Sequence, residues 1–152
     1  MMQAEEYLEK IPMWTREKHS LTDIRAFLHE MGDPDRKLSI IHVAGTNGKG
    51  SVCAFLTSLY RNAGFRTGTF ISPHLVTVRE RFLLNNEMVS PRKLQAAFET
   101  VLETVNIMKE KGYSHPSYFE FLFYMAMALF ADETPELVIL ETGLGGRLDA
   151  TN

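Results

Sequence analysis

A glycine-rich segment at residues 44–51, Ala-Gly-Thr-Asn-Gly-Lys-Gly-Ser, carries residue types that bind phosphate groups. Glycines let backbone N–H groups approach an anion, and a helix that begins at such a loop adds a favourable dipole. The lysine can place its charge between two phosphates, and the serine hydroxyl can reach a bound Mg²⁺. The spacing differs from the common G-x-x-x-x-G-K-[ST] pattern, yet we interpret the segment as a phosphate loop rather than a plain turn with a solvated lysine. Its candidate phosphate-binding residues are Gly45, Thr46, Asn47, Gly48, Lys49, Gly50 and Ser51.

A carboxylate with a different chemistry stands near the end of the chain. Glu141 follows the apolar run 137–140, which is the layout of a Walker B carboxylate. Mg²⁺ prefers such oxygens and bridges to substrate phosphates, so we favour a metal ligand over an ion pair with Arg147. The glycines at 143–146 are not a dinucleotide fingerprint, because Leu148 stands where G-x-G-x-x-G needs its last glycine.

A third candidate is Ser72, which follows the strand candidate 65–71 and precedes Pro73 and His74. Its hydroxyl could complete the oxygen shell of a metal ion. From these residues alone the favoured interpretation is an ordinary strand exit, with Ser-Pro as turn chemistry. Cys53, just inside the helix that follows the phosphate loop, is interpreted as a buried and unreactive thiol.

These residues need a scaffold that brings them together. Short apolar runs predict strands at 38–44 and 137–140, and segment 65–71 is a further strand candidate. Apolar spacing and capping residues predict helices over 24–31, 52–59, 91–108 and 117–130. Alternation of strands and helices predicts an α/β fold with three layers (α/β/α) and a mostly parallel sheet. Ligands bind at the carboxyl ends of strands in such sheets, which is where all three candidate segments lie.

Composition excludes several other classes of protein. The chain has 152 residues, a formal net charge of −3 and no basic cluster, so we expect no nucleic-acid partner. The longest apolar run, 121–131, is shorter than the about 20 residues that cross a bilayer, so we expect no membrane association. One cysteine and an acidic N-terminus without a signal-peptide pattern indicate a cytoplasmic protein.

Three ordered motifs give the chain a family resemblance. Segments 41–51 (IHVAGTNGKGS), 70–75 (FISPHL) and 140–152 (LETGLGGRLDATN) resemble folylpolyglutamate synthase/dihydrofolate synthase, a branch of the Mur ligase superfamily. Segments 16–21 and 116–121 also lie where that family has similar residues. The resemblance implies that residues 1–152 are the N-terminal part of a P-loop-containing Mur ligase central ATPase domain.

The resemblance also implies a reaction. ATP phosphorylates the carboxylate of folate or dihydropteroate, and the amine of L-glutamate attacks the acyl phosphate. Asn47, Gly48, Lys49 and Gly50 would cradle ATP, and Ser72 and Glu141 would bind Mg²⁺, with Lys49 and Glu141 as the catalytic residues. Leu148, Asp149 and Ala150 would line the pterin site, helped by residues near His19 and Tyr118.

The chain ends inside a glycine-rich loop, 142–152, so we interpret it as a fragment. By the resemblance, the remaining metal-ligand histidine, a carbamylated lysine and the C-terminal glutamate-ligase domain would lie beyond Asn152. We therefore expect a monomeric longer parent, no turnover by residues 1–152 alone, and a last strand whose edge lacks its natural neighbours.

Other functions stay open beside the leading one. A cell-wall Mur ligase would act on a UDP-MurNAc-peptide; the motifs at 72–75 and 148–150 favour folate instead. A non-catalytic nucleotide-binding switch would need N-K-x-D and D-x-x-G motifs, which are missing. A catalytically dead remnant is disfavoured because Lys49 and Glu141 are intact. The choice between dihydropteroate and folates stays open, and Asp149 leans toward a bacterial bifunctional enzyme.

Overall fold

The computed structural model describes residues 3–12, 19–143 and 149–152. Its α-helices are α1 (Ala4–Leu8), α2 (Leu21–Glu30), α3 (Lys49–Asn62), α4 (Pro91–Glu110) and α5 (Tyr118–Glu133). Its strands are β1 (Ile40–Val43), β2 (Thr67–Phe70), β3 (Phe82–Leu84), β4 (Glu87–Met88) and β5 (Leu137–Glu141). Two 3₁₀ turns, η1 (Pro34–Lys37) and η2 (Val78–Arg81), precede β1 and β3.

The strands form one mixed sheet in the order β1-β5-β2-β3-β4. β5 pairs in parallel with both β1 and β2, while β3 and β4 continue the sheet antiparallel. The predicted α/β class and its parallel core are thus confirmed. The expectation that the last strand would lack neighbours is wrong, because β5 is paired on both sides.

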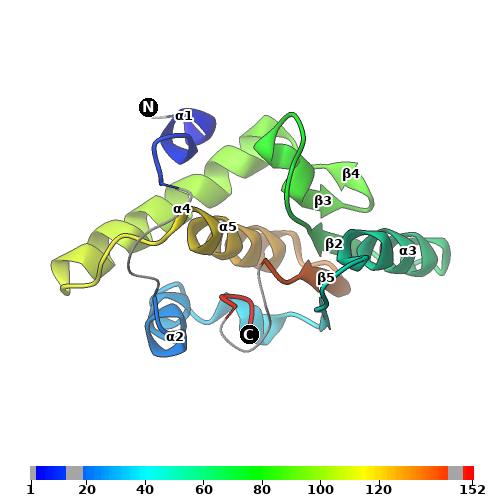
Figure 1. Cartoon of the computed structure of the whole chain (residues 1–152), viewed down its shortest axis with the longest axis horizontal. Coiled ribbons are helices and arrows are strands. Elements are labelled where there is room, and N and C mark those ends of the chain that lie inside the picture. Colours follow the sequence, from blue (N-terminus) through cyan, green and yellow to red (C-terminus); the bar gives the residue numbers. More distant parts are fainter. Residues whose placement is uncertain (1–2, 13–18, 144–148) are drawn as a thin grey trace.

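Helices cover both faces of the sheet, as the three-layer prediction requires (Figure 1). On one face, Cys53 of α3 packs with Val43 and Ile139 in a small apolar cluster. On the other face, α4 and α5 enclose the larger core, to which Phe70, Val138 and Leu140 belong. The central strands β2 and β5 are therefore covered on both faces, and β5 is apolar without alternation up to Glu141.

The predicted helix signals act as expected. Ser117 accepts the N–H of Glu120 and the Glu120 carboxylate accepts the N–H of Ser117, which is the capping box expected before α5. Ser90 caps α4, with Pro91 in its first turn. Gly64, at φ +91°, follows the end of α3. Although α5 is almost entirely apolar, no helix in the described ranges is both long and apolar enough to span a membrane.

The β3–β4 hairpin was not predicted. Its turn residues, Asn85 and Asn86, both have positive φ (51° and 66°), the conformation of a tight hairpin turn. The amide of Asn85 also ties the hairpin to β2, because its Oδ1 accepts the N–H of Thr67 at 2.9 Å. The pair of asparagines between two short apolar runs was the available signal.

Gly68 of β2 lies where α5 approaches the sheet closely. A Cβ at this position would come within 2.8 Å of the Phe130 ring, which is fully buried. We expect Gly68→Ala to lower the free energy of unfolding by about 1–3 kcal/mol, because the core has no room for the added methyl group. Urea unfolding measures the loss, and adding Phe130→Leu should recover part of it. An unchanged unfolding midpoint in Gly68→Ala would contradict the packing described here.

Candidate nucleotide and metal site

The parallel strands bring the candidate segments to one edge of the sheet. Val43 is in register with Glu141, and Phe70 with Leu140. The loops that follow β1, β2 and β5 therefore leave the sheet side by side. The structure thus places the phosphate-loop segment, Ser72 and Glu141 at the same carboxyl edge.

The phosphate-loop segment connects β1 to the first turn of α3. Gly48 is the N-cap residue and adopts φ +77°, a left-handed conformation that glycine tolerates without strain. Gly48 has no side chain with which to cap α3, so among the described residues the first N–H groups of this helix are available to an anion. Thr46 and Asn47 are exposed in the loop, and Gly50 and Ser51 lie in the first turn of the helix.

Lys49 folds back over this loop. Its Nζ donates a hydrogen bond to the carbonyl oxygen of Gly45 at 3.0 Å, which closes the loop into a ring. The ammonium group therefore lies over the same turn whose N–H groups begin α3. This arrangement can offer a phosphate one positive charge and several backbone donors together.

Glu141 provides a buried carboxylate beside the loop, with a relative exposure of 3%. Its Oε2 accepts the N–H of Ser72 at 2.8 Å, so the ends of β5 and β2 are joined through the two candidate metal ligands. A carboxylate has acceptor positions beyond this one bond. Within residues 3–12, 19–143 and 149–152, no group of three or more His, Cys, Asp or Glu side chains could hold a metal. A serine and one carboxylate fit Mg²⁺, which keeps waters and takes other ligands from phosphate.

Cys53 lies below this edge and has no solvent exposure. Burial raises the pKa of its thiol to about 12, and the negative charge of Glu141 adds to the effect while Lys49 opposes it. The thiol is therefore neutral and unreactive near neutral pH, as the sequence predicted.

Arg81 is a buried cation at this edge that sequence reasoning missed. Its Nε donates to Nδ1 of His74 at 2.8 Å, and its guanidinium carbon lies 5.6 Å from the centre of the Tyr118 ring. Burial lowers the pKa of Arg81, while Tyr118 and Glu141 oppose that shift. No pattern around η2 distinguishes it from its neighbour Arg79, which is only partly buried.

Two histidines make the fold sensitive to acid. Burial lowers the pKa of both His74 and His115 below the ordinary value of 6.5. His74 accepts the Arg81 hydrogen bond, and Nδ1 of His115 donates to the Pro116 carbonyl oxygen at 2.7 Å while its Nε2 accepts from Tyr7 at 2.8 Å. The bond from Arg81 requires a neutral His74 ring, and burial favours the neutral form of His115.

Below about pH 6.5 the unfolded chain therefore binds more protons at these histidines than the folded chain does, so stability falls as pH falls. Urea unfolding should give a lower free energy of unfolding at pH 5.5 than at pH 7.5. His115→Gln should flatten part of that slope. Equal stability at the two pH values would contradict the assignment of neutral rings.

The proposed pterin residues lie only partly in the described structure. Leu148 is outside the described residues, whereas Asp149 and Ala150 are both buried in the turn that ends the chain. Ala150 joins the larger core cluster. The structure thus brings this turn against the same domain that carries the phosphate loop.

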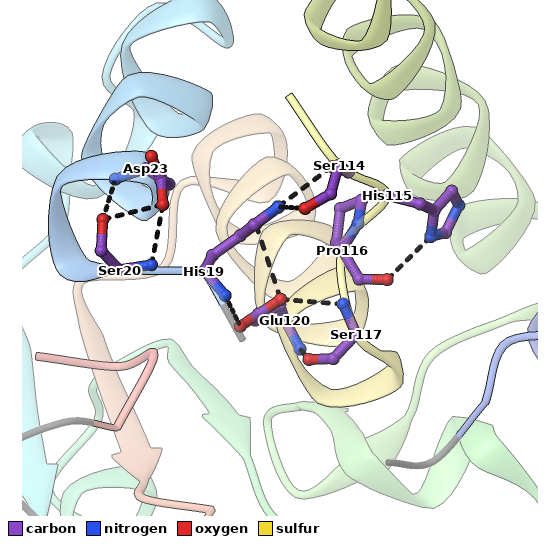
Figure 2. Close-up of polar contacts among 8 residues, drawn as sticks. All are labelled: His19, Ser20, Asp23, Ser114, His115, Pro116, Ser117 and Glu120. Atoms are coloured by element: carbon purple, nitrogen blue, oxygen red, sulfur yellow. Dashed lines mark hydrogen bonds and ion pairs between the residues drawn. The ribbon is translucent and has the colours of Figure 1, made fainter. Parts of the chain in front are cut away.

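The segments near His19 and Tyr118 are joined by polar contacts (Figure 2). His19 Nε2 donates to the Ser114 carbonyl oxygen at 3.0 Å, and the His19 backbone N–H donates to Glu120 Oε1 at 3.1 Å. The other oxygen of Glu120 accepts the Ser117 N–H at 2.8 Å. The start of α2 is thereby fixed to the N-terminus of α5, one residue from Tyr118.

Comparisons with known proteins find homologues of the chain. No protein-family model matches the chain. A folylpolyglutamate synthase of Arabidopsis thaliana is 47% identical over 116 residues, covering 76% of this chain and 20% of the relative. The dihydrofolate synthase/folylpolyglutamate synthase of Bacillus subtilis is 38% identical over 136 residues, covering 89% of this chain and 32% of the relative. The chain is a homologue of the folylpolyglutamate synthases.

The three-dimensional fold agrees with this assignment to the folylpolyglutamate synthase family. The structure of Escherichia coli FolC in complex with DHPP and ADP superposes with a TM-score of 0.84 at 32% identity, over 99% of this chain and 36% of that chain. The chain therefore spans about a fifth to a third of the length of these folylpolyglutamate synthase relatives.

Proposed function

We propose that this chain carries the MgATP site and part of the pterin site of an ATP-dependent ligase that adds L-glutamate to dihydropteroate or folate. The observation that carries the proposal is the meeting of the phosphate-loop segment with the buried Glu141–Ser72 pair at one sheet edge. The E. coli relative in complex with ADP supports it.

In this proposal the loop residues Gly45 to Ser51 hold the phosphates of ATP, and Lys49 neutralises the charge that develops as the γ-phosphate is transferred. Ser72 and Glu141 would hold Mg²⁺, which would neutralise part of the negative charge of the phosphates. The substrate carboxylate attacks the γ-phosphorus and ADP leaves. The glutamate amine then attacks the acyl carbon of the acyl phosphate, and inorganic phosphate and a proton are released.

For the substrate, we propose that Asp149 and Ala150, with Leu148, line the pterin site. The E. coli relative in complex with DHPP supports a pterin-type ligand, and the B. subtilis relative is named for both the dihydrofolate and the folylpolyglutamate activity. Both dihydropteroate and folate therefore stay in the proposal.

We propose that the L-glutamate site belongs to a further domain, and that the longer, monomeric parent covers surfaces exposed in residues 1–152. Phe55 and Leu59 on the outer face of α3 are 78% and 64% exposed, and β1 forms an edge of the sheet. The relatives are about three to four times as long as the chain, which supports such a covering segment. The cytoplasmic location stays a prediction, since several animal relatives are named as mitochondrial.

The test is a ligand panel on the 152-residue chain in the presence of MgATP. Dihydropteroate and folate binding is followed by fluorescence, UDP-MurNAc-peptide binding by calorimetry, and glutamylated product by chromatography. We expect pterin binding, no binding of the UDP-linked peptide and no steady product. Binding of the UDP-linked peptide alone would favour a cell-wall ligase, nucleotide binding alone would favour a non-catalytic module, and steady product would contradict the missing glutamate site.

A further inference from the structure

A chain of hydrogen bonds joins β1 to the turn that ends the sequence. His42 of β1 lies 2.8 Å through its Nε2 from the hydroxyl of Thr151, 109 positions away. The Thr151 hydroxyl donates to Asp149 Oδ1 at 2.5 Å, and the backbone N–H of Thr151 donates to the same oxygen at 3.1 Å. Asp149 and Thr151 are buried, whereas His42 is exposed at the sheet edge. In Figure 1 the C-terminal turn (red) lies beside the cyan segment that leads into β1.

The direction of these bonds is fixed by chemistry. A carboxylate only accepts hydrogen bonds, and a hydroxyl has one hydrogen to donate. The Thr151 hydroxyl therefore donates its hydrogen to Asp149. The bond between His42 and Thr151 then requires a hydrogen on His42 Nε2. His42 therefore acts as a donor that orients the Thr151 hydroxyl toward the carboxylate.

His42 also lies close to the phosphate-loop segment in the chain. It lies on β1 just before the phosphate-loop segment, and its neighbour Val43 accepts the N–H of Thr142 at 3.0 Å. The two ends of the segment 142–151 are thus both attached to β1, one through the Val43 backbone and the other through the His42 side chain. β1 therefore supports the phosphate loop and the proposed pterin residues at once.

We infer that His42 is a positioning residue for the pterin substrate: through Thr151 it holds the Asp149 carboxylate in its binding position. This inference rests on the proposed function. It assigns to His42 no contact with ATP, so its loss should separate substrate affinity from nucleotide affinity.

The experiment compares matched variants of the chain with dihydropteroate as the probe. His42→Phe keeps a planar ring without the donor, and Thr151→Val keeps the shape without the hydroxyl; His42→Gln keeps a donor. His29→Gln, on the exposed end of α2, is the control. NMR amide exchange of Thr151 without ligand reports the linkage itself.

We expect His42→Phe and Thr151→Val each to weaken dihydropteroate binding about tenfold. This is the effect expected when one hydrogen bond of the chain from His42 through Thr151 to Asp149 is lost. The double variant should be no weaker than either single one, because both break the same link. His42→Gln should stay within about threefold, and MgATP affinity within about twofold in all variants. The Thr151 amide should exchange faster in His42→Phe than in the unmodified chain.

Two results would overturn the inference in distinguishable ways. If the unmodified chain binds dihydropteroate and His42→Phe binds it equally well, the positioning role is wrong while the proposed function stands. If the unmodified chain binds MgATP but no dihydropteroate, the substrate assignment is wrong and the positioning role is lost with it. An unchanged Thr151 exchange rate in His42→Phe would contradict the linkage directly.

Discussion

Replacing Lys49 by alanine should weaken MgATP binding by about 10- to 100-fold, which corresponds to about 1.5–3 kcal/mol for charge-assisted hydrogen bonds to phosphate. Lys49 lies over the loop through its bond to the Gly45 carbonyl, and no carboxylate in the described part of the chain forms an ion pair with it. Its charge is thus free to pair with a bound phosphate. Affinity is measured by titration with a fluorescent ATP analogue in the presence of Mg²⁺.

The matched control for this variant is Lys10→Ala, which removes the same charge from an exposed surface pair with Glu6. It should bind MgATP like the unmodified chain. Circular dichroism of Lys49→Ala should show unchanged helix content, because only one hydrogen bond within the protein is lost. Equal MgATP affinity in Lys49→Ala and the unmodified chain would contradict the assignment of residues 44–51 as a phosphate loop.

Replacing Glu141 by glutamine should abolish the contribution of Mg²⁺ to ATP binding. The amide oxygen can still accept the Ser72 N–H, so the ends of β5 and β2 keep their connection. The negative charge that a divalent cation needs is lost, however. We expect ATP affinity in Mg²⁺ to fall about tenfold, toward the value measured in EDTA.

Glu136→Gln is the control for that charge change, since Glu136 lies just before the other end of β5 and is paired with exposed Arg66. It should leave the Mg²⁺ effect intact. A Glu141→Gln variant whose ATP binding is still strengthened by Mg²⁺ as in the unmodified chain would show that the metal is held elsewhere.

Local signals in the sequence predicted much of this fold. Capping residues such as Ser90 and Ser117 act within one helical turn, so the structure confirms them directly. The three parallel strands were also found, and in β5 burial on both faces leaves a continuous apolar run. The location of the candidate site at the ends of these strands was predicted from the general rule that ligands bind at the carboxyl edge of a parallel sheet.

Features that depend on distant pairing were not predictable in the same way. The position of β5 between β1 and β2 is decided by packing between segments about 70 to 100 residues apart, which no local pattern records. The burial of Arg81 and its bond to His74 arise from the same tertiary packing. The link from His42 to Thr151 joins residues 109 positions apart, and single residue types gave no sign of it.

One measurement tests the central claim most directly: calorimetric titration of the unmodified chain with ATP, once in Mg²⁺ and once in EDTA. If the loop and the Glu141–Ser72 pair form one MgATP site, ATP binds with a stoichiometry of about one, and Mg²⁺ strengthens binding about tenfold. No binding, or the same affinity with and without Mg²⁺, would contradict a joint nucleotide and metal site at this edge of the sheet.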